Sequence, residues 1–149
     1  MKFENYMILE FPSRSANEAF ARSAVACFAA QLDPTMEELG DIRTAVSEAV
    51  TNAIVHGYEG TRGMVTMRAR IDGTTLSIDI SDSGKGIPNV QQAMEPFYTT
   101  HPEQERSGMG FAVMQTFMDD LFVSSAPGEG TKVVMIKSFR CLPEAALNL

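Results

Sequence analysis

The sequence predicts an α+β fold, a two-layer sandwich of helices on a β-sheet. The predicted order of the elements is β-α-α-ββ-α-ββ, so the helices are grouped and do not alternate one for one with the strands. A tight-turn pair, Asp72-Gly73, separates two runs with strand composition and predicts a β-hairpin. A strong helix start at Thr35 adds a well-defined helix before this hairpin. These observations favour a sandwich over a doubly wound Rossmann sheet.

The first two elements are a short strand and an amphipathic helix. Residues 6–11 alternate loosely between apolar and polar side chains, and Pro12 follows them, which predicts a short strand. Residues 17–32 repeat apolar side chains at helical spacing up to Asp33-Pro34. The first helix is therefore predicted to end before that proline.

The second helix has the clearest boundaries in the sequence. Thr35 is followed three residues later by Glu38, which is the pattern of a capping box. The helix is predicted to run to Gly57, a residue type that favours a helix end. One continuous helix is predicted between these positions.

The remaining chain predicts four strands and one further helix. Strands are predicted over residues 64–71 and 75–81, on either side of the tight turn. A helix is predicted over residues 108–118. Two more strands are predicted over residues 121–125 and 131–138, joined by a turn rich in glycine and proline.

Composition indicates a single domain over residues 1–149, with no assigned role for the tail from about residue 140. The 149 residues are 44% hydrophobic, enough for one core. A net charge of -7 argues against nucleic acid as a direct partner, because phosphate contacts come mainly from Lys and Arg. No apolar run approaches the ~20 residues of a membrane span, and no signal peptide is evident, so a cytoplasmic protein is expected. Cys27 and Cys141 form no metal-binding or redox motif.

Three polar residues share one face of the second helix. Glu48, Asn52 and His56 stand four residues apart, so a carboxylate, an amide and an imidazole line one stripe. A solvated polar face explains the stripe equally well when it is taken alone. His56 is near the helix C-terminus, where the helix dipole favours an imidazolium, so a structural role is favoured for it.

A glycine-rich segment follows the second hairpin strand directly. Asp82, Gly84 and Gly86 alternate with other residues, which lets the backbone approach a planar ligand closely. The Asp82 carboxylate can accept a hydrogen bond from an exocyclic amine such as that of adenine. An ordinary turn accounts for this short pattern equally well. Lys85 lies inside it, and an exposed loop lysine needs no special role.

A second glycine cluster precedes the third helix. Its residues are Ser107, Gly108, Met109 and Gly110, whose backbone N–H groups, with the helix dipole, can bind phosphate. Residues 95–106 between the two clusters are polar and suit a mobile lid over a nucleotide.

These motifs, in this order and with Gly130-Thr131 near the last strand, resemble the GHKL family of ATPases, which has the Bergerat fold. Glu48-x-x-x-Asn52 resembles the N box of that family, and the two glycine clusters resemble its first and second glycine boxes. The resemblance covers almost the whole chain. The runs at residues 47–58 and 105–111 are similar to those of the anti-sigma factor serine kinases.

The resemblance implies a role for each matching residue. Asn52 would coordinate Mg²⁺ that bridges the phosphates of ATP or ADP, and Asp82 would recognise adenine with support from Thr131. Glu48 would be the general base, since a carboxylate one helical turn from the metal ligand can take a proton from an attacking hydroxyl. Arg106 could stabilise charge on the transferred phosphoryl group. Nucleotide binding would also involve both glycine clusters.

The resemblance also implies two protein partners and a homodimer. One partner would be a sporulation sigma factor held inactive, and the other an anti-anti-sigma protein phosphorylated on serine. Arg14, Glu18 and Arg22 stand four residues apart and would form a docking stripe if the first helix begins early. An ordinary solvated ion-pair stripe is an equally good interpretation.

Two other functions are compatible with the same motifs. A pure binding module would sequester a sigma factor and use nucleotide only as a structural ligand. The presence of both Glu48 and Asn52 favours catalysis over that module. A related stress-response anti-sigma serine kinase would share the fold and chemistry and differ only in its partners.

Overall fold

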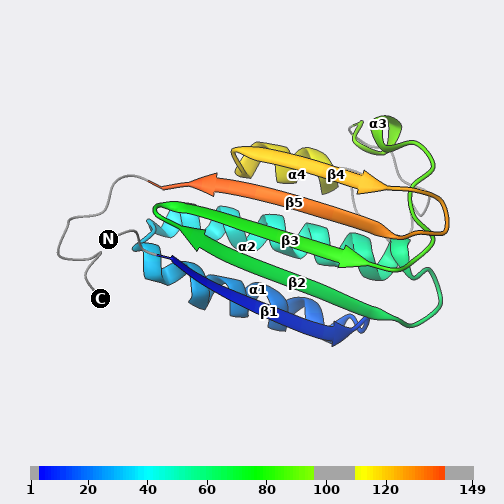
Figure 1. Ribbon diagram of the computed structural model, residues 1–149, viewed down its shortest axis with the longest axis horizontal. Coiled ribbons are helices and arrows are strands. Elements are labelled where there is room, and N and C mark those ends of the chain that lie inside the picture. Colours follow the sequence, from blue (N-terminus) through cyan, green and yellow to red (C-terminus); the bar gives the residue numbers. More distant parts are fainter. Residues whose placement is uncertain (1–3, 96–109, 140–149) are drawn as a thin grey trace.

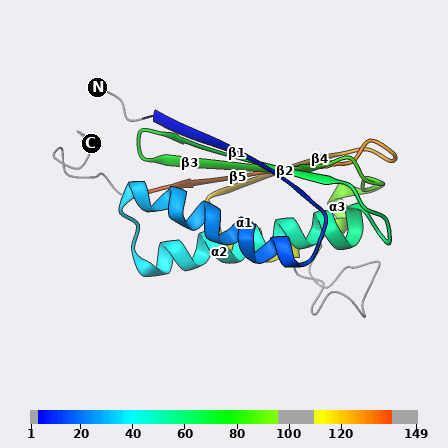
Figure 2. The ribbon, with the colours of Figure 1, turned by 90° about the horizontal axis from the view of Figure 1, so that it is seen from below.

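The computed structural model describes residues 4–95 and 110–139. It shows a five-stranded sheet with helices against one face (Figures 1 and 2), which confirms the predicted α+β sandwich. The strands are β1 (Glu4–Pro12), β2 (Met64–Asp72), β3 (Thr75–Asp82), β4 (Asp120–Ser125) and β5 (Thr131–Ser138). The helices are α1 (Ala16–Ala29), α2 (Met36–Thr51), α3 (Val90–Ala93) and α4 (Gly110–Phe117).

All four strand pairings are antiparallel, and the strand order is β1-β2-β3-β5-β4. The predicted hairpin is confirmed, with Asp72 paired to Thr75 across the turn. The last strand, β5, lies between β3 and the edge strand β4 (Figure 1). This order sets Asp82 opposite Thr131 at one end of the sheet.

The core lies between the sheet and the helices. Alternate side chains of β2 and β3 are buried, as expected for a sheet with one covered face. α1 and α2 lie on the same side of the sheet in Figure 2, and α4 packs against α2. The largest fully buried side chains in the described residues belong to Leu32, Ile42, Met67, Ile71, Leu76, Ile78, Ile80, Met114 and Met135.

The predicted capping box starts α2. The Thr35 hydroxyl accepts from the Glu38 backbone N–H at 3.0 Å, and the Glu38 carboxylate accepts from the Thr35 backbone N–H at 2.8 Å. Each bond satisfies a donor that the first helical turn leaves without an intrahelical acceptor.

The end of the second helix differs from the prediction. α2 ends at Thr51, and the segment Asn52–Gly57 forms a π-helix in place of a continuous α-helix. A π-helix hydrogen-bonds residues five apart, so it is a wider turn, and such turns occur frequently at functional sites. Residue spacing alone does not distinguish it from an α-helix.

The first helix also begins later than the docking stripe requires. α1 starts at Ala16, so Arg14 lies in the preceding turn, where its backbone N–H donates to the Pro12 carbonyl at 2.7 Å. The helical spacing argument therefore holds for Glu18 and Arg22 and is wrong for Arg14. The first strand, in turn, is longer than predicted.

A buried lysine connects β5 with two helices. The Lys137 ammonium donates to the carbonyl of Phe117, the last residue of α4, at 2.8 Å and lies 3.8 Å from the Asp41 carboxylate of α2. A cation at a helix C-terminus interacts favourably with the helix dipole. This contact fixes the far end of α4, whose first residue lies at the cavity described below.

The helices of the described residues include none that is long and apolar enough to cross a membrane.

Candidate functional site

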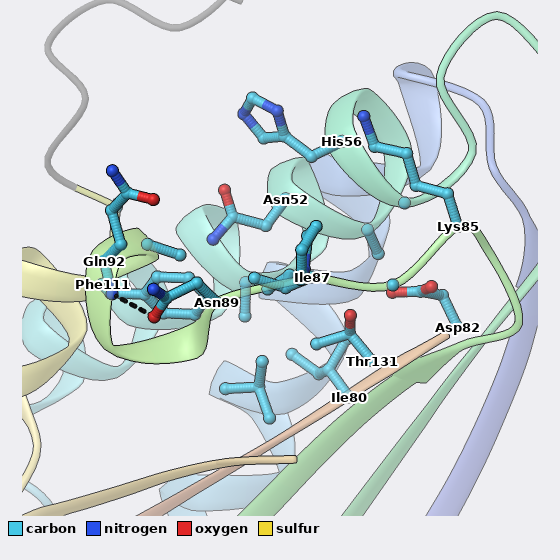
Figure 3. Close-up of a pocket in the computed structure, with 18 residues that line it drawn as sticks. Asn52, His56, Ile80, Asp82, Lys85, Ile87, Asn89, Gln92, Phe111 and Thr131 are labelled. Carbon is cyan, nitrogen blue, oxygen red and sulfur yellow. Dashed lines mark hydrogen bonds between the residues drawn. The ribbon is translucent and has the colours of Figure 1, made fainter. Parts of the chain in front are cut away.

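A cavity of about 400 Å³ opens at the end of the sheet where β3 finishes and β5 begins (Figure 3). Its volume is typical of small-molecule sites. The π-helical segment, the loop after β3, α3 and the start of α4 surround it. The lining residues are Ala49, Asn52, Ala53, His56, Gly57, Ile80, Asp82, Lys85, Gly86, Ile87, Pro88, Asn89, Gln92, Ala93, Gly110, Phe111, Thr131 and Val133.

Asp82 is the charged group at the sheet end of this cavity. Burial raises the pKa of its carboxyl above the ordinary value of 3.8, and hydrogen bonds from the backbone of Gly84 and Thr131 lower it without full compensation. The bond from the Gly84 N–H to Asp82 Oδ1 is 2.9 Å long. Figure 3 shows Asp82 and Thr131 side by side at the ends of their strands. The site thus has an oriented hydrogen-bond acceptor at this end.

The loop after Asp82 lies directly against the π-helical segment. A Cβ atom on Gly84 would lie 2.0 Å from the carbonyl oxygen of Gly57, so only glycine fits this close approach. The Lys85 backbone N–H donates to the same carbonyl at 2.9 Å. Gly86 has a φ of 77° and a virtual Cβ contact of 2.0 Å to the Ala126 carbonyl oxygen, which also restricts that position to glycine. The two predicted glycines therefore allow the loop to pack closely against its neighbours.

Tyr58 joins the same loop to β2. Its buried hydroxyl accepts from the Ser83 backbone N–H at 2.8 Å and donates to the Met64 carbonyl at 2.5 Å. The backbone next to Asp82 is thereby connected to the start of β2.

Ser125, the last residue of β4, connects three parts of the cavity wall. Its Oγ lies 2.7 Å from the Ile87 backbone nitrogen, 2.9 Å from the Gly130 carbonyl oxygen and 2.8 Å from Thr131 Oγ1. Sequence reasoning missed this residue, because a serine at a strand end carries no distinctive signal.

The helical side of the cavity carries the amide and the imidazole of the predicted stripe. Asn52 and His56 both line it and project from the π-helical segment in Figure 3. Glu48, one turn earlier on α2, is half-buried and is not among the lining residues of the described chain. The ammonium of Lys85, another lining residue, forms an ion pair with Glu59.

The structure brings together five of the predicted nucleotide-binding residues around one cavity: Asn52, Asp82, Gly86, Gly110 and Thr131. Gly84 supports the loop as described. Arg106, Ser107, Gly108 and Met109 lie outside the described residues, as does nearly all of the predicted lid.

The structure adds several lining residues that the sequence motifs did not predict. Asn89 caps the short helix α3, accepting from the Gln92 backbone N–H at 3.0 Å, and both side chains line the cavity. Asn89 is a residue type that often begins a helix, so it could have indicated α3. A helix of four residues is too short to show a repeating pattern of apolar side chains. Ile87 and Phe111 add apolar walls.

The described residues contain no cluster of three or more His, Cys, Asp or Glu side chains that could hold a metal ion. Asn52 offers a single amide oxygen to the cavity. That donor suits Mg²⁺, which keeps several waters and is bound largely by substrate phosphates.

Comparison with known proteins agrees with this geometry. The histidine kinase-like ATPase domain family matches residues 11–137. The anti-sigma F factor of Thermoanaerobacter sp. is 58% identical over 137 residues, covering 92% of this chain and 96% of the relative. The anti-sigma F factor of Clostridium acetobutylicum is 54% identical over 141 residues, covering 95% of this chain and 99% of the relative.

A solved structure shows the same fold at much lower sequence identity. The structure of the RsbU and RsbW domains of a Mycobacterium tuberculosis protein matches with a TM-score of 0.61 at 15% identity, covering 94% of this chain and 34% of that one. The extent of the family match and the identity to full-length relatives are decisive, and the chain belongs to the histidine kinase-like ATPase domain family, with anti-sigma F factors among its relatives.

Proposed function

We propose that the protein is an anti-sigma factor with ATP-dependent protein serine kinase activity. It would bind and inhibit a sporulation sigma factor and phosphorylate an anti-anti-sigma protein on serine. One observation carries the proposal: the Asp82 carboxylate and the Asn52 amide line the same cavity, from its sheet and helix sides. The anti-sigma F factor relatives support the identity of the first partner.

The two ends of the cavity suit the two ends of ATP. Asp82 and Thr131 would receive the adenine ring, and Ile87 and Phe111 would pack against its faces. Gly110 lines the cavity as the first residue of α4, so the phosphates would lie toward that helix start and Asn52. Ser107, Gly108 and Met109 are proposed to complete this phosphate contact.

Phosphoryl transfer would need a base and charge stabilisation. Glu48, one helical turn from Asn52, would take the proton from the attacking serine hydroxyl as the γ-phosphoryl group of ATP moves to that oxygen and ADP leaves. Mg²⁺ held by Asn52 and the phosphates would neutralise phosphate charge. Arg106 is proposed to stabilise the charge on the transferred group.

The partners and the assembly extend the same proposal. Glu18 and Arg22 on α1, with Arg14 in the turn before it, would dock the sigma factor. A homodimer and a cytoplasmic location follow from the family resemblance and from a sigma factor as partner. Analytical ultracentrifugation of the purified protein would test the dimer.

A phosphotransfer assay tests the kinase directly. The purified protein is incubated with labelled Mg-ATP and an anti-anti-sigma protein from the same genome, and phosphoserine on that protein is measured. We expect transfer by the wild type and a loss of at least about a hundredfold in Glu48→Gln, which removes a general base. Asn52→Ala should weaken Mg-ATP binding. Glu37→Gln is the matched control, because Glu37 is an exposed carboxylate in the first turn of the same helix.

The possible results separate the competing functions. ATP binding and sigma-factor inhibition without phosphotransfer would favour a sequestering module. Transfer together with binding to a stress-response sigma factor, and not to a sporulation sigma factor, would favour the related stress-response kinase. Absence of ATP binding by the folded wild type would overturn the proposal.

A further inference from the structure

Ser125 has three hydrogen-bonding neighbours but lies outside the cavity lining. Ile87 and Thr131 line the cavity, and Gly130 immediately precedes Thr131. A change at Ser125 would therefore reach a bound ligand only through its neighbours.

The donor and acceptor capacity of a hydroxyl fixes the direction of all three hydrogen bonds. A serine hydroxyl has one hydrogen and two lone pairs. The Ile87 N–H can only donate, so it uses one lone pair of Ser125. The Gly130 carbonyl can only accept, so it takes the single hydrogen of Ser125. The bond between Ser125 and Thr131 must then use the second lone pair, with Thr131 as the donor.

This assignment leaves Thr131 with lone pairs alone for a ligand. Its hydroxyl hydrogen points toward Ser125, with 2.8 Å between Thr131 Oγ1 and Ser125 Oγ. Its backbone N–H donates to the Asp82 carboxylate. The Asp82 carboxylate next to it is also an acceptor, and Oδ1 already receives the Gly84 N–H. The sheet end of the cavity thus offers two neighbouring acceptors. The exocyclic amine of a 6-amino purine can donate to this pair, whereas the exocyclic carbonyl oxygen of a 6-keto purine in the same place would face lone pairs.

We propose that Ser125 is a positioning residue that sets the base selectivity of the site, by holding the Thr131 hydroxyl as an acceptor for a 6-amino purine and against a 6-keto purine. The proposal rests on the proposed function, since it assumes that a purine nucleotide binds with its base beside Asp82.

The test compares ATP with inosine triphosphate, in which a 6-keto group replaces the 6-amino group. Affinities of both nucleotides are measured by calorimetry for the wild type, Ser125→Ala and Ser125→Thr. In Ser125→Ala the Thr131 hydroxyl is free to rotate and donate to a keto oxygen. We expect the preference for ATP over inosine triphosphate to fall roughly tenfold, consistent with the exchange of one hydrogen bond. Ser125→Thr keeps the hydroxyl and should retain the preference.

A second background separates this role from general support of the wall. Removing Ser125 also deprives the Ile87 N–H and the Gly130 carbonyl of a partner, which alone would weaken both nucleotides by the same factor. In Thr131→Val there is no hydroxyl to orient, so adding Ser125→Ala should leave the ATP preference unchanged. An unchanged preference in the Ser125→Ala single variant, or an equal loss of preference in both backgrounds, would overturn the proposal.

The same measurements distinguish a failure of the proposed function. If the folded wild type binds neither nucleotide, the nucleotide site itself is wrong. If it binds ATP and the preference does not respond to Ser125, only the role of Ser125 is wrong.

Discussion

At the scale of single residues, the Asp82 carboxyl lines the cavity in surroundings that disfavour its charged form. Its pKa is raised by burial, so the folded protein holds this proton at a higher pH than the unfolded chain does. The stabilising contribution of the protonated form is complete below the unfolded value near 3.8 and is lost as pH rises through the folded pKa. Ionised Asp82 therefore lowers the stability of the ligand-free protein.

Asp82→Asn tests this directly, because asparagine keeps the shape and cannot ionise. We expect the variant to gain stability relative to the wild type as pH rises from about 4, with the gain reaching a plateau above the folded pKa. Urea unfolding at a series of pH values measures the difference in the free energy of unfolding. Asp120→Asn, at an exposed carboxylate, should show no such trend. A difference that shrinks with pH would contradict the stated effect of burial.

At the scale of elements, the capping box of α2 is a separable source of stability. Thr35→Ala removes the hydroxyl that accepts the Glu38 N–H, and we expect a loss of about 1 kcal/mol in the free energy of unfolding. Glu38→Gln keeps an acceptor for the Thr35 N–H and should lose less. Chemical denaturation of the three proteins measures both changes. Equal losses in the two variants would show that the Thr35 hydroxyl has no special contribution.

The ion pair on α1 allows an effect of charge on partner binding to be measured apart from an effect on the stability of the fold. Glu18 and Arg22 form an ion pair of 2.9 Å with side chains 26% and 36% exposed, and a solvent-accessible pair four residues apart on a helix contributes only about 0–1 kcal/mol. Exchanging the two residues, Glu18→Arg with Arg22→Glu, keeps a pair and reverses the charge pattern. If this stripe docks the sigma factor, we expect binding to weaken at least about tenfold with an unchanged melting temperature. Unchanged sigma-factor binding would end the docking hypothesis.

The elements also show how far sequence reasoning reached. Caps, turns and periodicity are local, so the capping box, the hairpin and the presence of all five strands were predicted correctly, although β1 is longer than predicted. The π-helical segment was not predicted, because residue spacing does not distinguish it from an α-helix, and the contact at its end is long-range: the Gly57 carbonyl accepts the Lys85 N–H of a loop almost thirty residues later. The short helix α3 lacks a detectable period for its four residues.

The candidate site was predictable only in part, because some of its residues are brought together by contacts between distant parts of the chain. Asp82, Asn52 and Thr131 belong to motifs whose residue types are informative by themselves. Ser125 acquires its three partners because β4 pairs with β5 at the sheet edge, and this strand order comes from long-range packing. No periodicity in the sequence specifies it.

At the scale of the whole molecule, the cavity joins parts of the chain that are distant in sequence. It is lined by residues from Ala49 to Val133, so a ligand that fills it would contact both the helix layer and the sheet. A ligand that binds only the folded state stabilises it by about 2.7 kcal/mol at a hundred times its dissociation constant.

We therefore expect ATP, at a hundred times its dissociation constant, to raise the melting temperature of the protein by about 5–10 °C. Differential scanning calorimetry measures the shift. Cytidine triphosphate at the same concentration is the control, since it supplies the same phosphates without a purine. Equal shifts with both nucleotides would show that the base end of the cavity contributes no selectivity.

The strand order has a consequence for how the protein is made. The β2–β3 hairpin joins neighbouring residues and can form early, whereas β3 pairs with β5 across roughly fifty or more positions, a contact with a higher entropic cost of closure. Because synthesis runs from the N-terminus, Asp82 emerges from the ribosome long before Thr131 and its neighbours. A nascent chain that lacks β5 has no complete cavity wall, because Thr131 and Val133 belong to that strand, so we expect ligand binding to begin only after nearly all of the described chain has been translated.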